Sequence, residues 1–401
     1  MMTAPTSPYW LVFADENRPM SMRMVLGTRL AESDPVVIVE TAVSVRRTGR
    51  IPRLKNRLSR IAHAKAGWHY HPLHFPEEIP GLSGMMKNVN CLQLQRELGR
   101  IIPEKGMRIA CFDSPSQYYL AGKLGEYRSV YLAVDDRTRT VWGEPISGEL
   151  ESEKRLLGKV DLAICVSEFL AETLKDRMPE GRNIPIHVLP NGYDERLFDP
   201  DRKWPKPPVL ADVSSPKILV AGHISERIDW DGIIAAAQLR PEWTWLFVGP
   251  ADAGLREKID MLDHPGIPNR RRFAWKAPVP REHMPALISH CDACAVPYRL
   301  NRFTMASSPL KGIECLAMGA PVLSTRIPGL LRYGSVIQWV EEGKGESYAR
   351  ALDAIASESC NPASFAARCM AVSVDSNKER LRQFRLILER ELVESHDHCP
   401  R

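Results

Sequence analysis

The sequence predicts an α/β protein made of two doubly wound, Rossmann-like domains and a C-terminal helix. Short, nearly continuous apolar runs alternate with helical patterns in both halves of the chain, and such runs are typical of parallel strands that are buried on both faces. The length of 401 residues exceeds what one hydrophobic core usually serves. A Pro-, Asp- and Ser-rich segment at residues 199–217 therefore indicates a domain boundary near residue 205.

Each expected element is a segment whose apolar spacing fits a strand or a helix. The expected strands of the first domain, residues 1–205, are YWLVFA, PVVIVE, MRIACFD, SVYLAVDD, DLAICVS and IPIHVLP. Those of the second, residues 206–375, are KILVAG, TWLFVGP, RRRFAW, ACAVPY and APVLST, separated by helical segments such as WDGIIAAAQL and REHMPALISHC. Residues 376–401 should form a terminal helix and tail, whose apolar face consists of Leu381, Phe384, Leu388 and Leu392.

The composition, with 44% hydrophobic and 26% charged residues and a formal net charge of +5, is ordinary for a globular protein. No apolar run reaches the roughly 18 residues that cross a bilayer, and the N-terminus lacks the pattern of a signal peptide, so we expect a cytoplasmic protein. The nine cysteines are an odd number, and several lie in apolar segments such as LAICVS and IACFDS, which favours reduced core thiols over a disulfide framework. Cys291 and Cys294 have metal-ligand spacing, but without a second such pair packing in the core is favoured.

The stretch SSPLKGIECLAMGAPVLST, residues 307–325, combines a short apolar helix with two charged residues. Lys311, Glu314 and Met318 share one side of such a helix, and Ile313 and Leu316 share the other. One interpretation is an exposed salt bridge that is worth a few tenths of a kcal/mol. In the other, Lys311 contacts a diphosphate and the Glu314 carboxylate accepts the hydroxyl hydrogens of a ribose.

Ligands of open parallel sheets bind beyond the carboxyl ends of the strands. In the second domain Gly222 and His223 follow KILVA, and Tyr298 follows ACAVP. A glycine there lets the backbone approach an anion, and Arg227 in GHISERID adds a cation of the right sign. Each residue also has a plain alternative, because Gly222 can simply end a strand, Arg227 can be a surface residue and His223 can be structural.

In the first domain, Asp135 and Asp136 directly follow an apolar strand. A carboxylate at a strand end can serve as a general base. Two adjacent carboxylates also suggest a divalent-metal site, and an acidic helix N-terminus is the third interpretation. Neighbouring side chains of an extended chain point to opposite sides, so at most one of the two should face a cleft.

Several blocks of the second half follow one another in the order ILVAGHISERIDWDGI, TWLFVGP and MPALISHCDACAVPYRLNRFTMASSPLKGIECLAMGAPVLST. They resemble bacterial GT-B fold glycosyltransferases of the type that builds exopolysaccharide and teichuronic acid. The likeness extends through VYLAVDD, DLAICVSEFLAETL and VLPNGYDERLF in the first half. The resemblance implies two Rossmann-like domains that face a cleft, with a nucleotide-sugar donor on the second domain and an acceptor on the first.

Carried over by position, the resemblance implies roles for residues of the second domain. It assigns Lys311 to the donor diphosphate and Glu314 to the ribose. It places Tyr298 and the backbone at Leu310 beside the donor, and the loop at residues 222–223 near the diphosphate and the transferred sugar. With the cation that the charge argument adds, the expected donor-binding residues are Gly222, His223, Arg227, Tyr298, Leu310, Lys311 and Glu314.

Two further implications concern the chemistry. By likeness to an exopolysaccharide glucuronosyltransferase of the family, Asp135 is the expected base that deprotonates the acceptor hydroxyl. GT-B transferases generally need no divalent metal, so the resemblance argues against a metal pair at Asp135 and Asp136, and neither metal nor cofactor is expected. Retaining members commonly carry two glutamates around the nucleotide loop, but Ala306 stands at the first position, which leaves the stereochemical outcome open.

The leading hypothesis is transfer of a sugar from a nucleoside-diphosphate sugar to a hydroxyl of a growing glycan. A UDP-sugar is favoured over a GDP-sugar, and the expected acceptor is linked to a polyprenyl diphosphate. Without a metal, Lys311, Arg227 and helix N–H groups would stabilise the departing diphosphate. The alternatives are a nucleotide-sugar epimerase, which needs no acceptor, and a non-catalytic binding protein. A nucleic-acid binder is disfavoured because no recognition motif accompanies the basic residues.

A basic stretch without any acidic residue lies between Thr41 and Pro76, with apolar residues interleaved. Each Lys or Arg near an anionic membrane surface is worth about 1 kcal/mol. One interpretation is therefore peripheral docking on the inner face of the plasma membrane, and the other is a solvated basic helix. The residues expected to form the docking surface are Arg53, Lys55, Arg57, Arg60 and Trp68.

Overall fold

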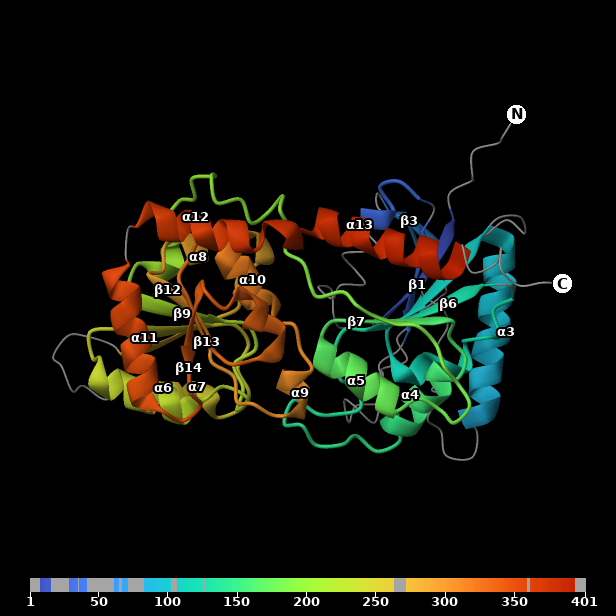
Figure 1. Cartoon of the computed structure of the whole chain (residues 1–401), viewed down its shortest axis with the longest axis horizontal. Helices are drawn as coiled ribbons and strands as arrows, with labels where there is room; N and C mark the ends of the chain where they lie inside the picture. Colours follow the sequence, from blue (N-terminus) through green and yellow to red (C-terminus); the bar gives the residue numbers. More distant parts are fainter. Residues whose placement is uncertain are drawn as a thin grey trace. The chain divides into compact units, whose positions relative to one another are not determined.

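The computed structural model describes residues 8–15, 29–34, 36–41, 61–64, 67–70, 83–101, 107–125, 127–262, 272–358 and 361–393. The chain divides into two compact units, which can be followed by colour in Figure 1. Unit 1 comprises Met1–Pro190 and Arg380–Arg401, and unit 2 comprises Asn191–Glu379. Each unit has a sheet of its own, so the predicted α/β class with two wound sheets is confirmed.

The sheet of unit 1 has eight strands in the order β3-β4-β2-β1-β5-β6-β7-β8. Neighbouring strands are parallel, except that β3 and β4 form an antiparallel hairpin at one edge. All the strands expected from the first half of the sequence form, and the sequence analysis missed β3 and β4. The strands are β1 (Tyr9–Asp15), β2 (Val36–Thr41), β3 (Ile61–Ala64), β4 (Gly67–Tyr70), β5 (Arg108–Phe112), β6 (Arg128–Ala133), β7 (Leu162–Cys165) and β8 (Ile186–Val188).

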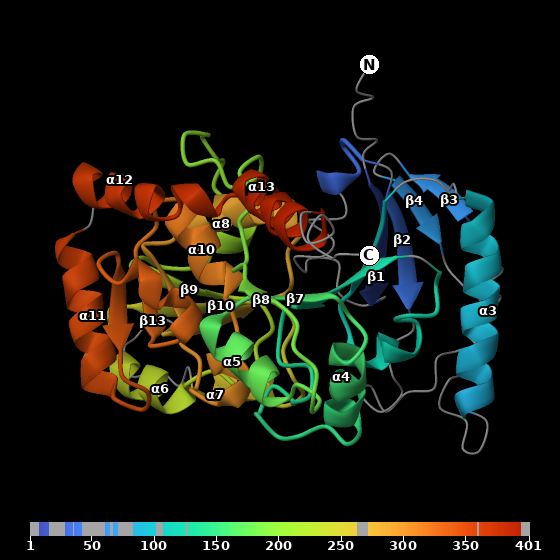
Figure 2. The same ribbon diagram turned by 45° about the vertical axis from the view of Figure 1, so that its right-hand side comes forward.

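Helices cover both faces of this sheet, as Figure 2 shows for α13 on one side and α4 and α5 on the other. They are α3 (Ser83–Ile101), α4 (Glu149–Leu157), α5 (Glu168–Asp176) and α13 (Asn377–Leu388). The fully buried ring of Phe384 on α13 lies 5.8 Å from the ring of Trp10 on β1. Leu388 and Leu392 are buried too, which confirms the apolar face of the terminal helix. This packing explains why residues from Arg380 onward belong to unit 1 and are not a separate third segment.

The sheet of unit 2 has six strands, all parallel, in the order β11-β10-β9-β12-β13-β14. The order reverses direction at β9, so this is the doubly wound arrangement that the sequence predicts. The edge strand β14 was not anticipated. The strands are β9 (Lys217–Ala221), β10 (Thr244–Val248), β11 (Phe273–Lys276), β12 (Ala293–Val296), β13 (Val322–Thr325) and β14 (Ile337–Val340).

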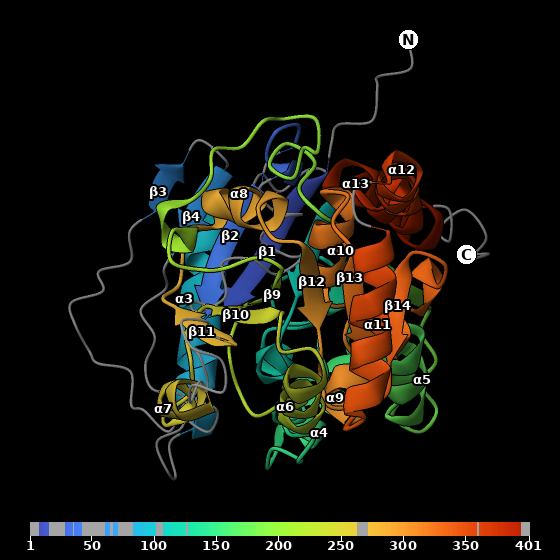
Figure 3. The same cartoon turned by 90° about the vertical axis from the view of Figure 1, so that its left-hand side faces the viewer.

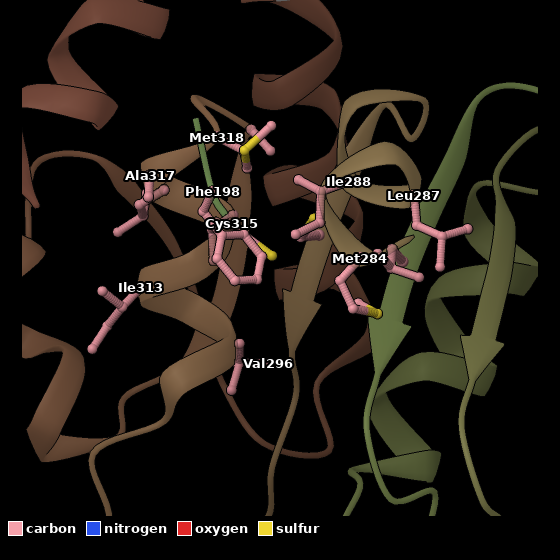
Figure 4. Close-up of a cluster of buried hydrophobic side chains, with 14 of the residues drawn as sticks. Phe198, Met284, Leu287, Ile288, Val296, Ile313, Cys315, Ala317 and Met318 are labelled. Atoms are coloured by element: carbon pink, nitrogen blue, oxygen red, sulfur yellow. The ribbon is translucent and has the colours of Figure 1, made fainter. Parts of the chain in front are cut away.

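Two apolar cores lie on the two faces of the unit 2 sheet (Figures 1 and 3). One core contains residues of α8 and α10, and Figure 4 shows part of it, including Phe198, Met284 and Ile313. The other core contains residues of α6, α7 and α11. The helices of unit 2 are α6 (Trp230–Leu239), α7 (Leu255–Leu262), α8 (Met284–Ser289), α9 (Arg302–Met305), α10 (Leu310–Ala317), α11 (Gly345–Ser357) and α12 (Pro362–Ala371).

The Pro-rich segment that suggested a linker at residues 199–217 belongs to unit 2. Leu210 and Val213 are buried in the core beneath α8 and α10, and Trp204 packs against the same core. Because these apolar side chains fix the segment to unit 2, the chain divides after Pro190 and not near residue 205.

Candidate functional site

The carboxyl ends of β9 and β10 carry two glycines that lie against each other. Gly222 directly follows β9 with φ of 121°, and Gly249 directly follows β10 with φ of 147°. Both values lie in the left-handed region that side chains disfavour. A Cβ at Gly249 would lie 1.9 Å from the carbonyl oxygen of Gly222, whereas a Cβ at Gly222 would meet open space. The backbones of the two turns therefore lie in close contact, and the space beside Gly222 is open.

Replacing Gly249 by alanine should destabilise the protein by more than the backbone strain of about 1–3 kcal/mol, because the backbone of Gly222 must also move. Gly254 is the matched control, since its φ is 81° but nothing lies within 4 Å of a Cβ built there. Gly254→Ala should cost only about 1–2 kcal/mol. Urea denaturation of both variants compares the two losses, and equal losses would show that the contact with Gly222 imposes no cost.

His223 and Arg227 lie in different surroundings. The Nε2 atom of His223 is 2.7 Å from a carboxylate oxygen of Asp252, and both side chains are exposed. The guanidinium of Arg227 lies over the ring of Tyr298, with Cζ 4.4 Å from the ring centroid, and Nη2 donates to the phenol oxygen at 3.4 Å. The carbonyl of Tyr298 in turn accepts a hydrogen bond of 2.7 Å from Thr325 at the end of β13. The structure thus joins Arg227 to Tyr298, beyond the carboxyl ends of β9 and β12.

Helix α10 carries the predicted charged pair, and the pair forms with 2.9 Å between Nζ of Lys311 and Oε2 of Glu314. The interpretation as an exposed salt bridge is wrong, because the side chain of Glu314 is 0% exposed and that of Lys311 only 29%. Met318 is buried as well as Ile313, and Figure 4 shows both in the core. The helix is therefore packed on most of its sides and has no wide polar face.

A second cation, Arg281, reaches the same carboxylate. Arg281 begins a short 3₁₀ turn before α8, and its Nη1 lies 2.6 Å from Oε1 of Glu314. Both oxygens of Glu314 are therefore engaged by cations in this structure. The sequence analysis missed Arg281, because its contact with α10 is tertiary and leaves no spacing signal in the chain.

The loop that leads into α10 is fixed from two sides. The side-chain amide of Asn191 donates to the carbonyl of Ser308 at 2.7 Å, and its backbone N–H donates to the Ser308 hydroxyl at 3.3 Å. A Cβ at Gly329 would lie 2.4 Å from the carbonyl oxygen of Ser307. The close contact between these two backbone segments therefore requires a glycine at position 329. Leu310, the half-buried first residue of α10, therefore follows a constrained backbone.

In unit 1, the two aspartates after β6 differ in their surroundings. Asp136 is 1% exposed and accepts hydrogen bonds of 3.0 and 2.9 Å from Arg177 and one of 2.7 Å from the hydroxyl of Thr138. Burial alone raises the pKa of Asp136, but these bonds outweigh it and leave the pKa below its ordinary value. Asp135 is half-buried. The next helix begins only at Glu149, so the interpretation of an acidic helix N-terminus is wrong.

The cysteines of the CxxC spacing belong to the core of unit 2. Cys294 is 1% exposed, and burial raises the pKa of the Cys291 thiol to about 12. Their packing as reduced thiols is confirmed. Among the residues that the structure describes, no group of three or more His, Cys, Asp or Glu is placed to hold a metal ion.

The predicted docking stretch is described only in part, because Arg53, Lys55, Arg57 and Arg60 lie outside the described residues. Trp68 lies in β4, which pairs with β2 and β3. Residues 61–64 and 67–70 are strands without any Lys or Arg, and the basic residues lie outside the described ranges, so both interpretations of the basic stretch stay predictions. Within the described ranges, none of the helices has the length and apolar character needed to span a bilayer.

Comparison with known proteins identifies a matching family and a related protein. Residues 215–358 match the family described as glycosyl transferases group 1. Over 201 residues, 47% of this chain, the sequence is 27% identical to the teichuronic acid biosynthesis glycosyltransferase TuaH of Bacillus subtilis (strain 168). The aligned part spans about half of that protein, 49% of its length.

Solved structures resemble nearly the whole chain. Sucrose-phosphate synthase from Thermosynechococcus elongatus aligns with a TM-score of 0.68 at 16% identity, over 97% of this chain and 100% of that one. The trehalose-6-phosphate protein from E. coli bound with UDP-2-fluoro glucose aligns with a TM-score of 0.70 at 12% identity, over 96% and 99% of the two chains. At such identities the likeness establishes the fold alone, which is GT-B.

Proposed function

Because this chain has the GT-B fold and residues 215–358 match the group 1 glycosyltransferases, we propose that it transfers a sugar from a nucleoside-diphosphate sugar to a hydroxyl of a glycan. The observation that carries the proposal is the position of the charged and glycine-containing turns of unit 2. They lie beyond the carboxyl ends of its strands, where ligands of this architecture bind, and within the matched residues 215–358.

We assign the donor to unit 2. The open space beside Gly222 suits the close approach of a diphosphate to the backbone, and Arg227 and Lys311 supply positive charge. These cations would stabilise the charge that develops on the departing nucleoside diphosphate, so the proposed reaction needs no divalent metal. A UDP-sugar is the favoured donor, which agrees with the UDP-2-fluoro glucose bound to the E. coli protein.

We assign acceptor chemistry to unit 1, with Asp135 as the base that takes the proton of the acceptor hydroxyl. The relative TuaH is described as a teichuronic acid biosynthesis protein, which supports a glycan of the cell surface as the acceptor class. Attachment of that glycan to a polyprenyl diphosphate, and docking of the basic stretch at residues 41–76 on an anionic membrane, are parts of the same proposal.

Thermal unfolding with UDP, GDP, ADP and dTDP, each with added Mg²⁺ and with EDTA, tests the donor assignment. A ligand at 100 times its dissociation constant stabilises the folded state by about 2.7 kcal/mol. We expect the midpoint to rise with UDP to the same extent in Mg²⁺ and in EDTA. No rise with any of the four nucleotides would contradict the proposal.

A reaction assay separates transfer from the rival functions on the same fold. A nucleotide-sugar epimerase would convert the donor sugar without any acceptor, and a binding protein would convert nothing. We expect release of the nucleoside diphosphate to depend on a glycan acceptor and to occur without epimerisation of the unused donor.

A further inference from the structure

We propose that Arg281 is a second phosphate-binding cation of the donor site, and that the buried carboxylate of Glu314 orients it together with Lys311. The inference rests on the proposed function, because it names a residue that binds the diphosphate of the donor. It also changes the expected role of Glu314, whose oxygens contact two cations.

The three side chains form one ion-paired group on unit 2. Oε1 of Glu314 faces Nη1 of Arg281 at 2.6 Å, and Oε2 faces Nζ of Lys311 at 2.9 Å. The carboxylate is 0% exposed, while the side chains of Arg281 and Lys311 are 19% and 29% exposed. The group therefore presents its two cations to solvent and hides its only anion.

The charge of this group exceeds what Glu314 needs. One cation balances a buried carboxylate, and Lys311 already supplies it. The second cation leaves the group with a net charge of +1 and adds its own desolvation cost. An anion with several negative charges, such as a nucleoside diphosphate, offsets this excess and gives both cations a partner.

The hydrogen-bond donors of Arg281 are also available. Within the described residues its guanidinium donates no hydrogen bond, and Oε1 of Glu314 accepts none, because their contact is an ion pair without hydrogen-bond geometry. A guanidinium has five N–H donors in a planar fork that matches phosphate oxygens. The donors of Arg281 that do not face Glu314 reach solvent, where the oxygens of a phosphate can replace water as their partners.

The aromatic ring of Phe198 limits the movement of this guanidinium. Cζ of Arg281 lies 5.1 Å from the ring centroid, within the range of a cation–π contact, and Phe198 itself is 1% exposed in the core. Glu314 and Phe198 together hold the guanidinium in place before the ligand arrives, which lowers the entropy cost of binding.

The inference is tested by calorimetric titration, which measures the affinity of each variant for uridine, UMP and UDP. If GDP gives a larger thermal shift than UDP, guanosine, GMP and GDP are used instead. Arg281→Gln should weaken UDP binding by about 10- to 100-fold, in the range expected for a lost hydrogen bond to a charged group, and change uridine binding by less than about threefold. The salt dependence of UDP binding should also become shallower. Arg281→Lys should restore part of the UDP affinity, because it restores the charge without the fork.

Folding should survive the substitution, because Glu314 keeps Lys311 as its partner. Arg240→Gln is the matched control, and this variant should keep the UDP affinity of the wild type. Arg240 directly follows α6 and pairs with Asp353 on α11. Unchanged UDP affinity in Arg281→Gln would overturn the inference, and so would equal losses for uridine and UDP, which would mean that Arg281 only shapes the site. A wild-type protein that binds none of the nucleotides would contradict the proposed function itself.

Discussion

Replacing Asp135 by asparagine is expected to slow sugar transfer by about 10²- to 10⁴-fold, the usual contribution of a general base, without changing donor binding. Asparagine has nearly the same shape but cannot accept a proton. Asp135 follows β6 at the carboxyl edge of the unit 1 sheet and is half-buried. The measurement is turnover with acceptor, compared with the thermal shift that UDP produces in the same variant.

The neighbouring Asp136 provides the matched control, because its substitution by asparagine should change the stability of the protein and not its turnover. Its carboxylate accepts the hydrogen bonds of Arg177 in the interior of unit 1, so Asp136→Asn should lower stability and leave the turnover of the folded molecules nearly intact. Undiminished turnover in Asp135→Asn would remove Asp135 from the mechanism. Loss of turnover in Asp136→Asn at full stability would mean that the two roles are exchanged.

Much of the fold could be predicted because its elements have strong local patterns. The residues WDGIIAAAQL coincide with α6, and the fully buried strands β7 and β10 are apolar at nearly every position. The strands that were missed are β3, β4 and β14, which lie at or next to sheet edges. An edge strand needs fewer apolar side chains, and the polar or small residues of IAHA, GWHY and IQWV hide the signal.

In the candidate site, contacts within one helix could be predicted from the sequence, and contacts between different elements could not. The pairing of Lys311 with Glu314 could be predicted because residues three apart on a helix are neighbours. The contact of Arg281 with Glu314 joins the turn before α8 to α10, and nothing in a single sequence indicates which turn meets which helix. For the same reason the complete burial of Glu314 could not be foreseen, because it depends on the elements packed around α10.

The second large effect is expected at Arg177, whose substitution by methionine should lower the free energy of unfolding by about 3–5 kcal/mol at pH 7. Arg177 donates to Asp136 and, at 2.6 Å, to Glu153 on α4. Glu153 is 0% exposed and also accepts a hydrogen bond of 2.7 Å from Tyr131. Methionine fills a similar volume but leaves two buried carboxylates without their shared cation.

The pH dependence of this loss follows from the two carboxyl groups. Burial raises the pKa of Glu153, and the charge of Arg177 offsets this only in part. The pKa of Asp136 is depressed, so its stabilising contribution is present above the ordinary carboxyl pKa and is lost as the pH falls through the depressed value. Without Arg177 both pKa values rise. The variant is then penalised most at neutral pH, and the penalty shrinks as the pH falls through the raised pKa values of its two carboxyls, because protonation removes the buried charges that Arg177 compensates in the wild type.

Differential scanning calorimetry at pH 7 and at pH 4 measures the difference between the wild type and Arg177→Met. Lys175→Met on α5, the helix that ends just before Arg177, is the matched control. Lys175 pairs with Glu172 at the surface, where ion pairs contribute little, so the unfolding midpoint of this variant should not change. An Arg177→Met deficit that is equally large at both pH values would mean that Arg177 stabilises unit 1 through its packing and not through its charge. A deficit confined to neutral pH would identify Asp136, Arg177 and Glu153 as the electrostatic support of the loop that carries Asp135.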